Sequence, residues 1–371
     1  MSGALVQLVS KGVQDSYIIS DEGHSFFRTK FTRHTNFSQA PKFIKNVTST
    51  DTSIVIPVYG DIINGIWLEA SSRGVNIASK LFYNSTIDLL IGGQKVDSQH
   101  YDYFSDIWTN YLADTYTKSK ELNTKGSSTN NMFLPLHFFF CDHKAFLPLI
   151  ALQHHQVEIR ITFDETNVAT LSESEKSAKI YGNYIYLDKD ERETFTTRNM
   201  DLIITQVQSL KQDLNVLQGG YNVIDISQFN HPVKSLFWGY SALSDNAYND
   251  RFTFSSVDLQ INGTHLLERM TPVYFHTVQN YYKSQYGRSY FTPSSESTYD
   301  TRYFTYHFCL NASDYNPSGT LNFSRIDNAS ITLHGAEKGS SRPANQEISI
   351  YAVNYNVLRI RNGLAGILFG N

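Results

Sequence analysis

The sequence has few of the features that mark an enzyme, a secreted protein or a membrane protein. Its 371 residues include only two cysteines, Cys141 and Cys309, which lie in separate apolar segments, so we expect both thiols to be reduced and buried. No apolar run approaches the roughly 20 residues that a membrane-spanning helix needs. The N-terminus also lacks a basic region followed by an apolar one. We therefore expect the chain to be made and kept in the cytosol.

Two further classes of function lack their usual signals. The net charge is only -4, so there is no basic excess to neutralise phosphates, and we expect no direct contact with nucleic acid. His154 and His155 are adjacent, so on a strand they would face opposite sides and could not bind one metal ion. His137 and His143, with Asp142 between them, are a weaker candidate for a metal site, and a core histidine and a turn explain them better. We expect no metal, cofactor or catalytic residue.

What the chain does contain is a long internal repeat, with a spacing of about 170 residues. Six matches occur in the same order in both halves. They pair Ile54 and Ile56 with Ile224 and Ile226, Ile66-Trp67 with Phe237-Trp238, Ile87-Asp88-Leu89 with Val257-Asp258-Leu259, Ile91 and Gly93 with Ile261 and Gly263, His137-Phe138 with His307-Phe308, and Val157 to Phe163 with Ala329 to Leu333. A repeat unit of this length has the size of a domain, so the sequence predicts two copies of one fold. Asp88 and Asp258 share one place in the repeat, which favours a role in the fold over a catalytic pair.

The composition predicts β structure in both copies. Aromatic residues make up 14% of the chain, with 24 Tyr and 24 Phe, and they occur in short runs separated by Gly, Asn, Asp and Ser. Seven strands are expected in each copy, one short of the eight in a jelly roll. In the first copy they cover residues 42–47, 53–58, 62–69, 86–91, 133–141, 157–163 and 180–187. In the second copy they cover residues 202–207, 223–226, 233–238, 256–261, 303–310, 329–333 and 348–353.

We predict an all-β chain of two consecutive eight-stranded jelly-roll barrels with a few short helices, at residues 99–112 and 188–195. The expected division has five parts: an N-terminal arm (1–40), a first jelly roll (41–187), a linker (188–199), a second jelly roll (200–360) and a C-terminal tail (361–371). Polar stretches at 114–131 and 277–301 occupy equivalent places in the two copies, so we expect loops on one face of the molecule. The apolar tail residues 363–369 are expected to pack under the second barrel, with a contact to a partner as the alternative.

Three segments resemble signatures of one family of viral proteins. Residues 3–37, with the runs Gly-Ala-Leu-Val-Gln-Leu-Val and Phe-Phe-Arg-Thr-Lys-Phe-Thr-Arg-His-Thr-Asn-Phe, are similar to the N-terminal signature of major capsid proteins of large nucleocytoplasmic DNA viruses. Residues 229–234 (Phe-Asn-His-Pro-Val-Lys) and 317–328 (Pro-Ser-Gly-Thr-Leu-Asn-Phe-Ser-Arg-Ile-Asp-Asn) resemble two further signatures. The chain departs from the family at Ser20 to His24, where many relatives have a Gly-Asn-Pro turn, and its loops are short.

The resemblance implies a double jelly roll that forms homotrimers, each a capsomer of pseudo-sixfold outline in an icosahedral shell assembled in the host cytoplasm. The implied partners are the chain itself, neighbouring capsomers, minor capsid and penton proteins, and an inner virion membrane. The N-terminal arm has no counterpart in the second copy. Phe27, Thr29 and Phe31 alternate with Arg28, Lys30 and Thr32, which gives one partly apolar edge and one basic edge. Our candidate contacts to other capsomers or to the inner face are Arg28, Lys30 and Arg33. A strand that covers the base of the first barrel is an equally good interpretation.

Seven Asn-X-Ser/Thr sequons occur, at Asn36, Asn46, Asn84, Asn262, Asn311, Asn322 and Asn328. A chain rich in Asn, Ser and Thr produces such sequons by chance, so glycosylation, with Asn84, Asn262 and Asn311 as its candidate sites, is not expected.

Two alternatives to the capsid interpretation remain open. A carbohydrate-binding β-sandwich is suggested by tyrosines 281, 282, 286, 290 and 299, and a cupin-like enzyme by the jelly-roll pattern, although this enzyme would contain bound metal.

Overall fold

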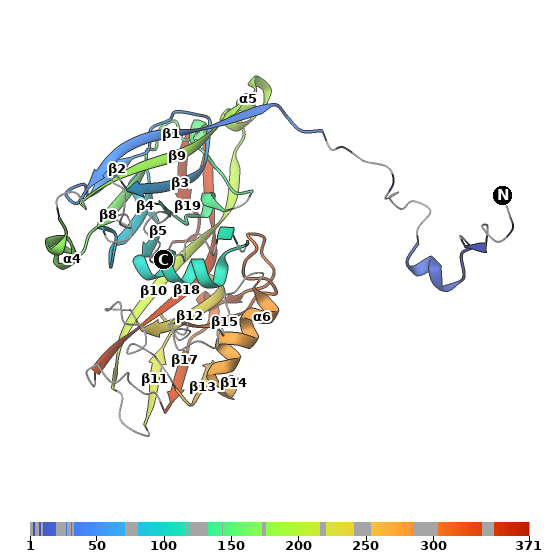
Figure 1. The fold of residues 1–371 in the computed structure, drawn as a ribbon, viewed down its shortest axis with the longest axis vertical. Helices are drawn as coiled ribbons and strands as arrows, with labels where there is room; N and C mark the ends of the chain where they lie inside the picture. The colour runs from blue at the N-terminus through green and yellow to red at the C-terminus, as the bar shows by residue number, and fades with distance from the viewer. Residues whose placement is uncertain are drawn as a thin grey trace. The chain divides into compact units, whose positions relative to one another are not determined.

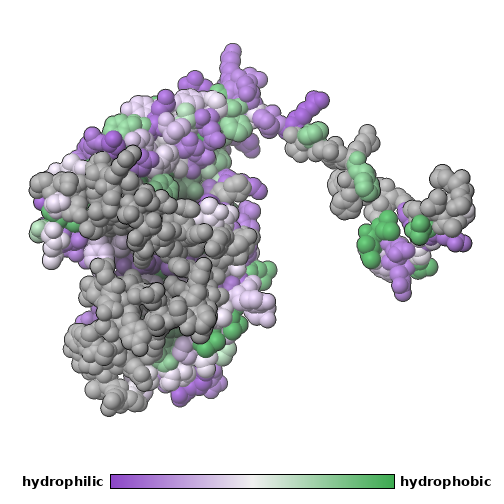
Figure 2. Space-filling model, in the orientation of Figure 1, coloured by the Kyte–Doolittle hydropathy of each residue, from purple (hydrophilic) through white to green (hydrophobic). Residues whose placement is uncertain are grey.

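The structure is a computed structural model, and it divides into two compact units, residues 1–36 and 37–371. It describes residues 3, 7–8, 10–19, 27, 31, 33–70, 81–115, 117–118, 133–142, 144–172, 176–215, 220–240, 254–284, 303–335 and 345–370. In the first unit the described residues contain one 3-10 helix, η1 (Gln14–Tyr17), which buries none of its side chains. Apolar atoms on this unit are exposed (Figure 2). No helix among the described residues has the length and apolar character to cross a membrane.

The second unit holds two jelly-roll barrels, each made of two antiparallel sheets (Figure 1). The sheets of the first barrel follow the orders β1-β9-β3-β6, with β7 on β3, and β2-β8-β4-β5. The bounds are β1 (Phe37–Thr48), β9 (Ser177–Leu187), β3 (Ile62–Ala70), β6 (Phe133–Pro135), β7 (Leu147–Pro148), β2 (Ser53–Val55), β8 (Val157–Thr162), β4 (Thr86–Ile91) and β5 (Gln94–His100).

The second barrel repeats these two strand orders. Its sheets run β10-β18-β12-β15, with β16 on β12 and β19 on β18, and β11-β17-β13-β14. The bounds are β10 (Met200–Asn215), β18 (Asn345–Arg361), β12 (Pro232–Tyr240), β15 (Tyr303–His307), β16 (Leu321–Asn322), β19 (Leu364–Ile367), β11 (Tyr221–Asp225), β17 (Ala329–His334), β13 (Ser256–Ile261) and β14 (Thr264–Met270). The predicted all-β double jelly roll is therefore confirmed.

Short helices connect the strands. They are η2 (Tyr103–Leu112), η3 (Phe139–Cys141), η4 (Leu149–Ala151), α4 (Glu165–Thr170), α5 (Lys189–Thr197), η6 (Tyr274–Val278), α6 (Gln279–Lys283) and η8 (Phe323–Arg325). The π-helix η2 lies between the two barrels, and its counterpart η6–α6 lies on the flank of the second barrel (Figure 1). Helix α5 is the predicted linker helix. It is tied to the first barrel, because Arg192 Nε lies 3.1 Å from Asp61 Oδ1.

Several predicted boundaries are wrong. The eighth strand of each barrel, β5 and β14, was missed, and β5 takes residues assigned to the start of the helix at 99–112. The strand predicted over 133–141 ends at Pro135 and is followed by helix η3. The pairing of Ile66-Trp67 with Phe237-Trp238 is one residue out. Both strands carry a bulge at the same place in the repeat, after Ile63 and after Val233. Counted from this shared bulge, the counterpart of Trp67 is Phe237.

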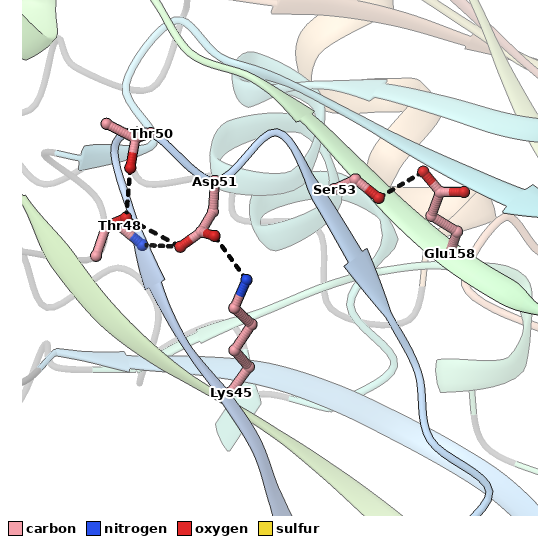
Figure 3. A network of polar contacts seen from close by, with 6 residues as sticks. All are labelled: Lys45, Thr48, Thr50, Asp51, Ser53 and Glu158. Atoms are coloured by element: carbon pink, nitrogen blue, oxygen red, sulfur yellow. Dashed lines mark hydrogen bonds and ion pairs between the residues drawn. The ribbon is translucent and has the colours of Figure 1, made fainter.

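Hydrogen bonds at the strand connections hold the sheets in register. In the turn after β1, Asp51 accepts from Lys45 Nζ at 2.6 Å and from the Thr48 amide at 2.8 Å (Figure 3). Ser53 on β2 donates to Glu158 on the neighbouring β8 at 2.6 Å. The turn therefore joins the end of β1 in one sheet to the start of β2 in the other, which closes one corner of the first barrel.

Candidate functional site

The junction between the barrels is built like a protein core. Helix η2 of the first barrel presses two tyrosines on the outer face of the sheet β10-β18-β12-β15. Tyr111 packs on Phe237 with ring centroids 6.0 Å apart, and Tyr103 packs on Tyr351 at 6.4 Å. The Tyr111 hydroxyl also donates to the carbonyl of Tyr303 at 2.8 Å. All of these side chains are buried, so the apolar core of the first barrel continues onto the outer face of this sheet, while the second barrel keeps a separate core on the inner face.

Polar groups lock the same junction from the side of β5. The carboxylate of Asp97 accepts from the Val207 amide on β10 at 2.8 Å and from Gln99 Nε2 at 2.7 Å. Gln206 Nε2 donates to the carbonyl of Val96. Burial raises the pKa of Asp97 to about 7, and these hydrogen bonds oppose the shift only in part. The contact between β5 and β10 is therefore a specific one, with a carboxylate at its centre.

A second buried charge lies at this junction. Burial lowers the pKa of Lys234 and raises that of Asp142 to about 6, while the two charges attract each other across the barrels. The Lys234 ammonium lies 5.6 Å from the ring centroid of Tyr355. Lys234 ends the signature at residues 229–234. The other signature of the second half lies against it, because the His231 amide donates to Ser324 Oγ at 2.8 Å.

The C-terminal tail also contacts both barrels. Strand β19 pairs with β18, so the tail packs on the second barrel as expected. It reaches the first barrel as well, since the His154 amide donates to the carbonyl of Gly363 at 3.0 Å and His155 Nδ1 lies 3.1 Å from the amide nitrogen of Ala365. The tail is thus a strap across the junction.

The histidines singled out in the sequence are structural. His137 is stacked on Trp108, with centroids 3.6 Å apart, and burial lowers its pKa to about 3. His307, its counterpart, is held by Ser235 Oγ at 2.8 Å, and burial lowers its pKa to about 3 as well. Both rings are therefore neutral near pH 7. His143 lies outside the described residues, and the described residues contain no group of three His, Cys, Asp or Glu side chains suited to a metal ion.

The repeated aspartates hold hairpins. Asp88 accepts from Ser98 Oγ at 2.5 Å, across β4 and β5. Asp258 accepts from the Arg269 amide at 2.6 Å and lies 2.7 Å from His334 Nε2, across β13, β14 and β17. Each carboxylate serves its own barrel, in agreement with the predicted role in the fold.

Only one of the candidate contacts of the arm lies within the described residues. Arg28 and Lys30 lie outside the described residues, and Arg33 is described and exposed.

Two of the candidate sequon asparagines are half-buried. Asn84 donates its amide nitrogen to Asp164 at 2.8 Å, and Asn311 accepts from the Ser313 amide. Asn262 is exposed in the β13–β14 turn, and its side-chain oxygen accepts from the amides of residues 327 and 328. Tyr281 and Tyr282 are exposed, and the other three tyrosines of the carbohydrate-binding hypothesis lie outside the described residues.

Sequence reasoning missed the junction residues. Phe237, Tyr351 and Tyr111 read as ordinary core aromatics, because a strand pattern does not say which of its two faces meets another domain. The signal that could have found Phe237 and Tyr351 is a departure from alternation. Strand β12 is apolar on both faces over residues 236–238, as expected for a sheet that is covered on both sides.

Comparison with known proteins agrees with this geometry. Residues 191–366 match the family model of the large eukaryotic DNA virus major capsid protein, and residues 25–188 match that of the major capsid protein N-terminus. The chain is 33% identical to the major capsid protein of Pyramimonas orientalis virus and 28% identical to that of Paramecium bursaria Chlorella virus 1, in each case over 100% of both proteins.

Solved structures share the fold. A chain of the PBCV-1 virus capsid quasi-atomic model superposes with a TM-score of 0.78 at 24% identity, over 94% of this chain and 100% of that one. The Faustovirus major capsid protein superposes with a TM-score of 0.67 at 10% identity, over 95% of each chain.

Proposed function

This chain belongs to the major capsid protein family of large eukaryotic DNA viruses and is a structural protein of the virion capsid, and from that membership we propose that it forms homotrimers. Each trimer would hold six barrels and serve as one capsomer of pseudo-sixfold outline in an icosahedral shell. Assembly would take place in the host cytoplasm.

The observation that carries this proposal is the pair of barrels with one strand order, fixed side by side by a buried junction. A rigid pair of similar barrels is a good building block for a sixfold-like tile made from three chains, because each chain then contributes two similar edges. The apolar packing of Tyr111 on Phe237 and the hydrogen bond from Val207 to Asp97 fix the pair, so that it behaves as one body.

Other partners belong to the same proposal. Neighbouring capsomers would contact the barrel flanks, and minor capsid and penton proteins would contact the base and the vertices of the shell. The N-terminal arm would lie on the inner side, where its basic residues Arg28, Lys30 and Arg33 would contact neighbouring capsomers or acidic lipid head groups of an inner membrane. No direct contact with nucleic acid is proposed.

Electron microscopy and mass photometry of the purified full-length chain test the proposal. The expected result is particles of three times the chain mass with a hexagonal outline. Monomers without this outline at micromolar concentration would contradict it. Glycan-array binding by a stable monomer would favour the carbohydrate-binding alternative instead.

A further inference from the structure

Each barrel has a helix surface and a sheet surface of the same kind. Within a single chain, only the helix surface of the first barrel contacts the sheet surface of the second. Tyr103 and Tyr111 on helix η2 cover Phe237 and Tyr351 on the outer face of the second barrel. The counterparts of all four residues exist in the other copy. On the sheet they are Trp67 and Tyr181, each 170 positions earlier (237 and 67, 351 and 181), and on the helix they are Tyr274 and Tyr282, each 171 positions later (103 and 274, 111 and 282).

The equivalence is structural as well as numerical. Trp67 and Tyr181 are cross-strand partners on β3 and β9, just as Phe237 and Tyr351 are on β12 and β18. On the helices, Trp108 stacks on His137, while Gln279, which is 171 positions later, accepts from the amide of His307 at 3.2 Å. Both helices therefore sit on their barrels in the same register.

The burial of these counterparts differs sharply. Tyr111 is 3% exposed, whereas Tyr282 is 76% exposed. On the adjoining strands, Val96 of β5 is 3% exposed because β10 covers it, whereas its counterpart on β14, Leu266, is 46% exposed. Figure 2 shows apolar and weakly polar atoms beside η6–α6 at this flank of the second barrel.

The sheet side is also built for contact. Phe43, Tyr181 and Trp67 form one row across β1, β9 and β3. The Phe43 and Tyr181 rings are 5.6 Å apart, and the Tyr181 and Trp67 rings are stacked at 5.9 Å. Phe43 is 46% exposed and the other two are half-buried. An aromatic row on an outer sheet face is typical of a protein interface.

We propose that the helix surface of one copy (Leu266, Tyr274 and Tyr282) packs on the sheet surface of a second copy (Phe43, Trp67 and Tyr181), and so repeats between chains the junction that already exists within each chain. The inference rests on the proposed homotrimer and names its contact faces. The occupant is a second copy because the pattern that fits each surface is present in the chain itself. The contact is heterologous, since each chain offers one surface of each kind, and three such contacts close a ring.

Glutamate variants test the proposal. Tyr282→Glu and Phe43→Glu each place a charge in the proposed contact, and both residues are exposed enough for the barrel to keep its fold. Each should weaken trimer formation by about thirtyfold or more, as for an aromatic anchor at an interface, with an unchanged circular dichroism spectrum. The matched control is Tyr221→Glu, an exposed tyrosine on β11 at the opposite edge of the sheet that contains β14, and it should stay trimeric.

Cross-linking gives a test that does not depend on disruption. Gln206 on β10 bonds to Val96 on β5 within the chain, and by the same registers Ala40 on β1 should meet Leu266 on β14 of the next chain. The double variant Ala40→Cys, Leu266→Cys should therefore give covalent dimers and trimers on oxidation, and the single variants should not. Trimers that survive both glutamate variants, or a trimeric double cysteine variant that gives only monomers on the gel, would overturn the assignment. A wild-type chain that is monomeric would instead overturn the proposed homotrimer.

Discussion

At the scale of single residues, the junction depends on carboxylates that burial makes weak acids. Asp97 contacts β10 through the Val207 amide, and Asp88 is the nearby charge that raises its pKa further. In the unfolded chain this carboxyl loses its proton near pH 4, whereas in the folded chain it keeps the proton up to about pH 7. The folded state therefore binds more protons between these values, and the contribution of Asp97 to stability falls as the pH rises through this window.

We expect Asp97→Asn to remove this dependence. The free energy of unfolding of the wild type should fall by up to about 4 kcal/mol between about pH 4 and pH 7 on account of Asp97, and the variant should lack this term. His137 and His307 act in the opposite sense, since their lowered pKa values make stability rise with pH, so the difference between the two proteins is the quantity to measure. Urea unfolding at several pH values measures it. Asp51→Asn is the control, because the pKa of Asp51 is lowered, so this carboxyl loses its proton below about pH 4 in both states and its removal should leave the slope between pH 4 and pH 7 unchanged. Equal slopes for wild type and Asp97→Asn would contradict the expectation.

At the scale of elements, the sequence predicted most strands and missed those whose signal lies in a turn. Strands β5 and β14 each follow a tight hairpin, with positive φ at Gly92, Gly93, Asn262 and Gly263. The Asn-Gly pair is a strong hairpin signal and could have identified β14. Strand β5 has the mostly polar sequence Gln-Lys-Val-Asp-Ser-Gln-His. The second barrel nevertheless buries it, because its contact with β10 is made by hydrogen bonds as well as by apolar side chains. No local pattern could have predicted that burial.

The junction itself could be predicted only in part. The repeat and the family signatures indicated two barrels, but which faces meet depends on contacts between residues as far apart as Tyr111 and Tyr303. The one-residue error at Trp67 has a simple origin. The sequence comparison aligned Trp67 with Trp238, 171 positions apart, whereas the bulge that both strands share places Trp67 170 positions from its counterpart Phe237. A shift of one residue along a strand exchanges its inner and outer faces.

The C-terminal tail gives a prediction for one element. Removal of residues 362–371 deletes β19, the contact of Ala365 with His155, and the carbonyl of Phe369 that accepts from Asn356 Nδ2 at 2.9 Å. Because Asn356 is buried and would lose a partner, we expect the free energy of unfolding to fall by about 2 kcal/mol or more. Thermal and urea unfolding check this, with a chain that lacks only residues 370–371 as the matched control. Equal stability of the two truncated chains would show that the strap contributes nothing.

At the scale of the whole molecule, the N-terminal arm is a segment that the repeat does not explain. Residues 1–36 form their own unit, and Val13, Tyr17 and Ile18 on or beside η1 are exposed. Exposed apolar side chains on a segment outside both barrels favour a role in binding other molecules over a role in the stability of the barrels. This separates two functions within the chain: the barrels would make the trimer, and the arm would join trimers to one another or to the inner face of the shell.

Deletion of residues 1–25 tests that separation. Since the deletion leaves both barrels and the proposed helix and sheet surfaces intact, we expect the trimer mass to be unchanged by mass photometry, while closed shells are absent from electron micrographs of assembly reactions. The deletion keeps Arg28, Lys30 and Arg33, so the variant with all three changed to Gln separates the basic edge from the apolar part that precedes it. If the arm acts through its basic edge, the Gln variant should lose binding to vesicles that contain acidic lipids, and the deletion should retain it. Closed shells built by the deleted chain would show that the barrels alone carry the contacts between capsomers.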